Sequence, residues 1–122
     1  MDWKMLVVIN YMVDNLHQKN NLSELAQLVN MSPSHLSYKF KAETGMSLVR
    51  YQKSLKLQKA KELLETTCLR IKEVMVMVGI NDESHFVRDF KREFHVTPTE
   101  HRVICMNIKY DVGAVPMKLA NK

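Results

Sequence analysis

The stretch SHLSYKFKAE at residues 34–43 returns fifty residues later as SHFVRDFKRE at residues 84–93, with five of the ten positions identical. Just upstream the apolar residues correspond again, but at an offset of 49, so that Leu25 and Val29 match Val74 and Val78. The one-residue change in offset falls where a turn would separate two helices. An internal repeat of this kind predicts two copies of the same small unit, each built from a pair of helices.

Start and stop signals delimit both helices of the first unit. A helix is expected over about residues 21–30, because Asn21 begins a capping-box pattern. Ser32 and Pro33 open the next helix, with serine as the N-cap and proline at the first helical position. Gly45 is suited to end that helix as a left-handed C-cap.

The second unit carries similar signals. A helix is predicted over about residues 71–78, ended by Gly79, and Asn81 is predicted to cap the helix that follows. Residues 97–100, Thr-Pro-Thr-Glu, form a capping box that starts a final helix through about Cys105.

Two further helices complete the expected fold. A long helix from Ser47 to about Glu65 joins the units, and an N-terminal helix over residues 3–18 has an apolar stripe of Leu6, Ile9, Val13 and Leu16. The chain is therefore predicted to be all-α, with seven helices. They form two helix-turn-helix subdomains, at residues 1–46 and 67–105, joined by a linker helix at residues 47–66. Residues 106–122 show no clear period and are predicted to form an irregular tail.

Composition limits the class of protein. The chain has 122 residues and a net charge of +5, and its stretch 37–61 holds seven cations against the single acid Glu43. A basic region of this kind suits an anionic partner. Cys68 and Cys105 are read as reduced thiols of a cytosolic protein. The longest apolar runs are far too short to cross a bilayer, so no membrane association is expected.

Paired short helices with a tight turn fit the helix-turn-helix pattern, whose second helix enters the major groove of DNA. The predicted reading helices cover about residues 33–44 and 82–94. Their inner faces are apolar, and Phe86, Phe90 and Phe94 form a stripe in the second. Their outer faces supply the candidate base-reading side chains, which are Ser34, His35, Ser37, Tyr38, Glu83, Ser84, His85, Val87 and Arg88.

The linker helix sets the spacing of the two reading helices. Nineteen residues span roughly 28 Å at about 1.5 Å per residue, and one turn of duplex is about 34 Å. One chain is therefore expected to contact two adjacent major-groove segments, at an asymmetric site or a direct repeat.

Other functions fit the sequence less well. A helical interaction module with a basic face would bind an acidic partner or an anionic membrane without base preference. The sequence shows no nucleophile–base pair, phosphate loop or paired catalytic carboxylates, so it is not predicted to be an enzyme or to hold a cofactor. His95, His101 and Cys105 match no usual zinc spacing, so no metal site is predicted.

The sequence also resembles a known family. RIKEVMVMVGINDESHFVRDFKREFHVTPTEHR at residues 70–102, and NLSELAQLVNMSPSHLSYKFKAETGMSLVRYQKSLKLQKAKELLETT at residues 21–67, resemble the DNA-binding domain of AraC/XylS transcription regulators. The resemblance implies sequence-specific binding of promoter DNA, often with activation through RNA polymerase. It also implies a separate effector or receiver domain in a longer parent chain. Carried over by position, the phosphate-contacting candidates are Lys39, Lys41, Lys53, Lys56, Lys91 and Arg92.

Three positions depart from the family pattern. The family usually has phenylalanine where Ile80 stands. It favours alanine where Met75 stands, and the larger Met75 side chain predicts wider packing of the second helix pair. It usually has glycine where His95 stands, so the turn before Thr97 is expected to differ. The acids Asp82, Glu83 and Asp89 on or beside the second reading helix predict weaker DNA affinity for that unit.

Overall fold

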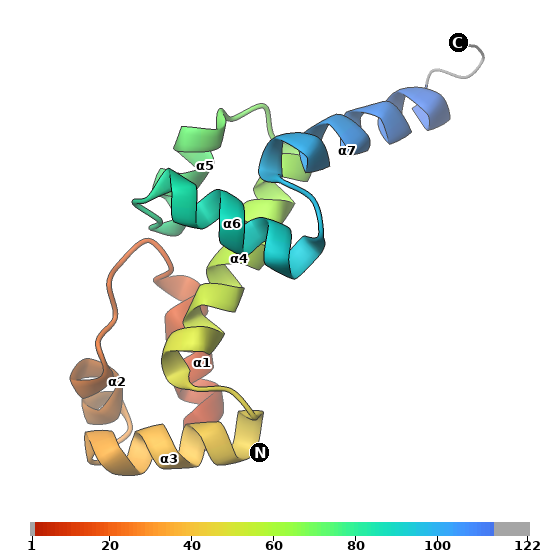
Figure 1. Cartoon of the computed structure of the whole chain (residues 1–122). Coiled ribbons are helices and arrows are strands. Elements are labelled where there is room, and N and C mark those ends of the chain that lie inside the picture. The colour runs from red at the N-terminus through yellow and green to blue at the C-terminus, as the bar shows by residue number, and fades with distance from the viewer. Residues whose placement is uncertain (1, 114–122) are drawn as a thin grey trace.

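The computed structural model of the chain describes the backbone of residues 2–113 and the side chains of residues 2–107. All regular structure in this range is helical, which confirms the predicted fold class (Figure 1). The helices are α1 (Trp3–Asp14), α2 (Leu22–Leu28), α3 (Pro33–Thr44), α4 (Leu48–Thr66), α5 (Ile71–Val78), α6 (Glu83–Phe94) and α7 (Pro98–Gly113). None of the helices in the described range is long and apolar enough to cross a membrane.

Helix α4 is shared by two separate hydrophobic cores. Its first half contributes Leu48 to a core formed with α1, α2 and α3, and its second half contributes Leu57, Ala60, Leu63 and Leu64 to a core formed with α5 and α6. Figure 1 shows the two groups of helices arranged along α4, one at each end. Because each group buries its apolar face against the same rigid helix, α4 fixes the position of one unit relative to the other.

The predicted apolar stripe of residues 3–18 is only partly correct. Leu16 is buried and Ile9 packs half-buried against the core, but Leu6 is 49 % and Val13 is 46 % exposed. Within α1 the buried residues are Met5, Val8 and Met12. Helix α1, WKMLVVINYMVD, is apolar on most of its circumference, so two stripes fit the helical period almost equally well. Packing against α2, α3 and α4 decides which of them faces the core. The helix also ends at Asp14, with Asn15 as its C-cap, and not near residue 18 as predicted.

The helix starts agree with the capping signals, except at the start of α6. Asn21, Ser32 and Ser47 are N-caps, and Thr97 and Glu100 form the predicted reciprocal capping box, with N···O distances of 2.8 and 3.2 Å. Helix α6 is capped by Asp82, not by Asn81, because the Asp82 carboxylate accepts the backbone N–H of His85 at 3.0 Å. The offset of 50 residues from Ser32 leads to Asp82, so the repeat itself contained the correct signal.

His95 occupies the position expected to alter the turn before Thr97, but the turn is preserved. His95 has a φ of +70° and its backbone N–H donates to the carbonyl of Lys91, as Gly45 with a φ of +82° donates to that of Lys41. Both residues therefore end a reading helix in the left-handed conformation. The expectation of a different turn is wrong, since this backbone conformation is open to a residue with a side chain at an energetic cost.

The last helix is longer than predicted. Helix α7 continues past Cys105 to Gly113, so residues 106–113 are helical and not an irregular tail. The sequence has neither glycine nor proline between Pro98 and Gly113, and without a breaking residue the backbone hydrogen bonds propagate beyond the part of the helix that packs on α4. The remainder of the predicted tail, residues 114–122, lies outside the described residues.

Candidate nucleic-acid interface

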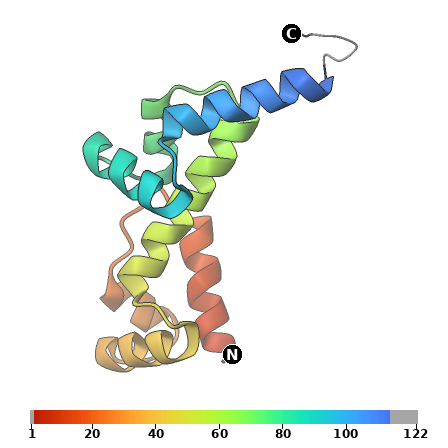
Figure 2. The same ribbon diagram turned by 45° about the vertical axis from the view of Figure 1, so that its right-hand side comes forward.

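The two predicted reading helices, α3 and α6, lie on the same side of α4. Figure 2 shows both of them to the left of α4 and α1 to its right, and in Figures 1 and 2 their N-terminal ends point in the same direction. Each is the second helix of its pair, following α2 or α5. This placement gives one molecule two helix ends that could approach one face of an extended ligand.

The inner faces of α3 and α6 hold these helices in place. Leu36 and Phe40 of α3 are fully buried, and so are Phe86 and Phe90 of α6 to within 1 %. Phe94 is half-buried, and its ring centroid lies 4.7 Å from that of Phe90, as the predicted phenylalanine stripe requires. The opposite, outer faces of α3 and α6 carry mainly polar side chains.

Eight of the nine predicted base-reading residues are exposed, and Val87 is half-buried. Tyr38 is the most prominent, with 77 % of its surface exposed. The N-terminal halves of both helices carry them, where a groove-inserted helix presents its side chains to base edges. The exposed set comprises Ser34, His35, Ser37, Tyr38, Glu83, Ser84, His85 and Arg88.

In the first unit, one predicted phosphate contact is engaged within the protein. The Lys39 ammonium lies 2.9 Å from the Asp2 carboxylate and 3.6 Å from that of Glu43. The hydrogen bond from Lys39 lowers the pKa of Asp2, and the same contact raises the pKa of Lys39. Lys39 therefore fastens the start of α1 to α3, and its charge is already balanced.

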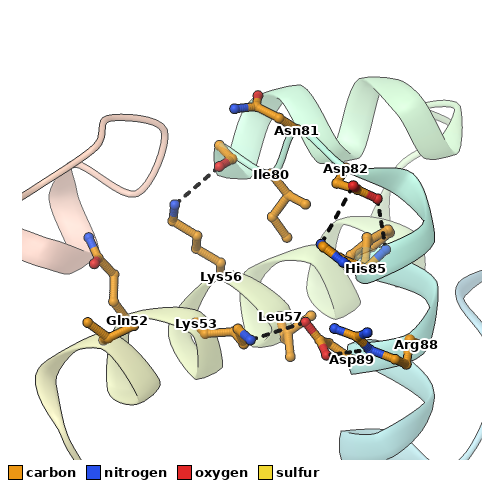
Figure 3. A pocket seen from close by; sticks show the side chains of 13 residues that line it. Gln52, Lys53, Lys56, Leu57, Ile80, Asn81, Asp82, His85, Arg88 and Asp89 are labelled. Carbon is orange, nitrogen blue, oxygen red and sulfur yellow. Dashed lines mark hydrogen bonds and ion pairs between the residues drawn. The ribbon is translucent and has the colours of Figure 1, made fainter.

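In the second unit, the carboxylate of Asp89 binds two candidate DNA contacts at once. It lies 3.3 Å from the Lys53 ammonium of α4 and 3.5 Å from Nε of Arg88 (Figure 3). The Asp89 side chain is 11 % exposed, while those of Lys53 and Arg88 are 54 % and 55 % exposed. Burial acts to raise the pKa of Asp89, but the two cations hold it below its ordinary value.

Lys56 serves as a structural contact between α4 and the turn after α5. Its ammonium donates to the carbonyl oxygen of Gly79 at 3.1 Å, and burial lowers its pKa (Figure 3). Lys56 and Lys53 line a groove of about 510 Å³ between α4 and the start of α6, together with His85 and Arg88. The groove brings predicted base-reading and phosphate-contacting residues together at the junction of the two units.

The three remaining predicted phosphate contacts form an exposed basic surface. Lys41, Lys91 and Arg92 are exposed, and no ion pair engages them within residues 2–107. A second groove, also of about 510 Å³, places Arg50 of α4 near Arg92 of α6. Arg50 was absent from the predicted site, although it belongs to the basic stretch 37–61 and the charge pattern could have found it.

Comparison with known proteins places this arrangement in a family. A family model described as a helix-turn-helix domain matches residues 25–103. The arabinose operon regulatory protein of Escherichia coli K12 is 34 % identical over 114 residues, which cover 93 % of this chain and 39 % of that protein. This chain belongs to the AraC-type family of helix-turn-helix transcription regulators. The family comprises regulators, not enzymes.

Two further relatives fit the same assignment. The transcriptional regulator MtrA of Neisseria gonorrhoeae is 33 % identical over 95 residues, or 78 % of this chain and 32 % of that protein. An AraC-type regulator structure from Chromobacterium violaceum superposes with a TM-score of 0.79 at 25 % identity, covering 84 % of this chain and 91 % of that one. The chain thus spans about a third to two fifths of the length of the two curated relatives.

Proposed function

We propose that this chain binds double-stranded promoter DNA in a sequence-specific manner and so controls the initiation of transcription. The observation that carries the proposal is the placement of α3 and α6 on one side of α4, with their N-terminal ends pointing the same way. Helices of this class insert that end into the major groove. A shared rigid linker helix lets both insert into adjacent segments of one duplex.

The exposed side chains of these helices are assigned to reading bases. Arg88 suits guanine, Glu83 can accept from cytosine, and Val87 suits the methyl group of thymine. In the first unit His35 and Tyr38, with the serines beside them, would read the bases. The two units differ in charge, because the first turn of α3 has no acidic residue while that of α6 has Glu83 after the Asp82 cap. The first unit is therefore assigned the larger share of affinity.

The predicted phosphate contacts divide into two groups. Lys41, Lys91 and Arg92 are exposed and free to bind phosphate, and Arg50 joins them as a new candidate. Lys53 can turn to the duplex only by leaving Asp89, and Lys39 and Lys56 act chiefly within the fold. Contacts of this kind position the protein without specifying sequence.

The greater length of the curated relatives suggests partners other than DNA. Because those proteins are much longer than this chain, we propose that the domain acts with an effector or receiver domain, in the same chain or a separate one. We also propose that the protein contacts RNA polymerase and acts in the cytoplasm.

Selection of random duplexes by the purified chain at near-physiological salt tests the proposal. Two short motifs in fixed order, about one helical turn apart, are the expected result. Recovery of a single motif would mean that only one unit specifies bases, and we expect that unit to be the first. No enrichment would reject sequence-specific reading by this chain and favour a basic interaction module.

Three substitutions separate base reading from phosphate binding. Arg88→Ala and His35→Ala are each expected to relax selection at one motif, with a loss of about 1–3 kcal/mol at the affected position. Lys91→Ala is the control, and it should weaken all sequences alike and reduce the salt slope by about 1. If all three variants lose affinity without a change in the selected motifs, the assigned base readers are wrong.

A further inference from the structure

Three unlike side chains meet where α7 packs against the end of α4. Glu65 comes from α4, and His101 and Cys105 come from successive turns of α7. Nε2 of His101 lies 2.8 Å from Oε2 of Glu65 and 3.5 Å from Sγ of Cys105. One oxygen, one nitrogen and one sulfur atom from these residues all lie within 4.8 Å of one another. The sequence analysis grouped His101 and Cys105 with His95 and predicted no metal site; it missed Glu65, which is 36 residues away from His101 along the chain.

The fold holds the three residues in place independently of their contacts with one another. The neighbouring Arg102 donates to the backbone carbonyls of Leu64 and Thr67 at 3.3 and 3.2 Å, and also to that of Leu69. These bonds fix the start of α7 against the end of α4. The ring of Phe90 packs beside the imidazole of His101 with a centroid distance of 5.8 Å. These contacts fix the backbone from which the three side chains extend, as well as the ring of His101, and such preorganisation favours metal binding.

The chemistry of the donors selects the kind of ion. A carboxylate oxygen, an imidazole nitrogen and a thiolate sulfur are the ligands that Zn²⁺ takes in proteins. Calcium and magnesium prefer oxygen ligands alone. At bond lengths of about 2.0–2.3 Å, ligands around a tetrahedral zinc lie roughly 3.3–3.8 Å apart. The nitrogen–sulfur distance already falls in that range, and the nitrogen–oxygen pair must open by about half an ångström.

We propose that Glu65, His101 and Cys105 form a three-ligand site for Zn²⁺ that ties the last helix to the linker helix. On binding, the Cys105 thiol releases its proton to solvent as the sulfur–zinc bond forms. Nε2 of His101 gives up to solvent the proton that it shares with the Glu65 carboxylate, and Nδ1 takes one up, so the neutral ring changes tautomer and presents its Nε2 lone pair to zinc. The hydrogen bond between His101 and Glu65 is thereby replaced by two bonds to the metal. Lys61, 3.3 Å from the same Glu65 oxygen, remains as a neighbouring positive charge.

A three-residue site leaves the fourth tetrahedral position open to water or another ligand. Its structural effect would be confined to the second unit, since α7 contacts α4 and α6 there. Zinc is therefore expected to stabilise the folded chain. The proposal does not rest on DNA binding, because metal binding is measured on the protein alone.

Titration of the reduced full chain with Co²⁺, a spectroscopic substitute for zinc, tests the site directly. One equivalent is expected to produce a thiolate-to-cobalt absorption band in the near ultraviolet, and added Zn²⁺ should remove it. Cys105→Ser should abolish the band, and His101→Gln and Glu65→Gln should weaken Co²⁺ binding at least about tenfold. Cys68→Ser and Glu62→Gln are matched controls that keep the band, because both residues lie outside the cluster.

A second measurement uses the unaltered chain and so avoids variants that fail to fold. Zn²⁺ is expected to slow the alkylation of Cys105 by iodoacetamide and to leave Cys68 unaffected. It should also raise the melting temperature by roughly 5 °C or more when it saturates the site. Cobalt binding without a thiolate band, equal protection of both cysteines, or an unchanged Cys105 reactivity in saturating Zn²⁺ would each overturn the proposal.

Discussion

The buried carboxylate of Asp89 joins α6 to α4 and holds two side chains that are proposed to contact DNA. Among residues 2–107, Asp89 is the one charged residue that is buried, and it is held by Lys53 and Arg88. Its pKa is lowered in the folded state, so its ionised form stabilises the fold at a pH above the pKa of the unfolded chain. That contribution is lost as the pH falls through the lower pKa of the folded state.

Asp89→Asn is expected to lower the free energy of unfolding at neutral pH by on the order of 1 kcal/mol, because the buried partner of two cations loses its charge. The difference between variant and parent should begin to shrink as the pH falls through the ordinary pKa of an aspartate, about 3.9, and should vanish only below the lower pKa of the folded state. Urea unfolding at several pH values measures both effects. A constant difference between neutral and strongly acidic pH would contradict this account of Asp89.

The same substitution should strengthen DNA binding. Removing the Asp89 charge releases Lys53 toward the phosphates and Arg88 toward the bases, and it takes one repelling charge away from the interface. Asp89→Asn is expected to tighten binding several-fold at low salt and to make the salt dependence steeper. Glu93→Gln is the control, since it removes an acid from α6 that no ion pair engages within residues 2–107. An equal gain in DNA affinity from both variants would mean that the change in net charge alone causes the tighter binding.

The helix ends differ in how much their backbone conformation costs. Gly45 and His95 end the two reading helices with nearly the same positive φ, but only His95 carries a side chain there. A side chain in the left-handed region costs about 1–2 kcal/mol, part of which is offset because glycine loses more entropy on folding. His95→Gly is therefore expected to stabilise the chain by roughly 0.5–1 kcal/mol.

The reciprocal change, Gly45→Ala, should destabilise the chain by about 1 kcal/mol, since an added Cβ at Gly45 would meet no atom within 4 Å and only the conformational cost applies. Urea unfolding of both variants checks the pair. A destabilising His95→Gly would show that the His95 side chain makes a stabilising contribution larger than its backbone cost.

Gly79 joins the two units as well as ending α5. A Cβ at this residue would lie 2.7 Å from the carbonyl oxygen of Leu16 and 3.0 Å from the Cα of His17, both backbone atoms of the segment after α1. Gly79→Ala is expected to cost about 2–4 kcal/mol, because steric overlap adds to the cost of a φ of +76°. A cost no greater than that of Gly45→Ala, measured in the same denaturation series, would show that this segment moves away freely.

The shape of the complete chain gives a prediction that needs no substitution in the protein. Because α4 is a continuous helix of 19 residues that belongs to both cores, α3 and α6 cannot rotate independently. Inserting about five base pairs, half a helical turn, between the two selected motifs should turn one motif to the far side of the duplex. Affinity is then expected to fall at least about tenfold, toward that of one unit. Unchanged affinity would indicate flexibly linked units.

Sequence signals alone were enough to predict the repeat, the helices found within residues 2–113, most of the helix ends and the apolar faces of α3 and α6. These features depend on local rules: capping residues, left-handed glycines and side chains three or four residues apart. For the same reason the sequence placed eight exposed side chains on the outer faces of the reading helices, although their roles as base readers stay predictions.

Tertiary packing was needed to establish which face of α1 is buried, which cations are paired and which donor atoms meet at the end of α4. Asp2 reaches Lys39 on α3, Asp89 reaches Lys53 on α4, and Glu65 reaches His101 on α7. Such contacts join residues far apart in the chain, and no periodicity links their positions. They form because helices packed on a shared core bring distant side chains within reach, and opposite charges attract most strongly where water is partly excluded.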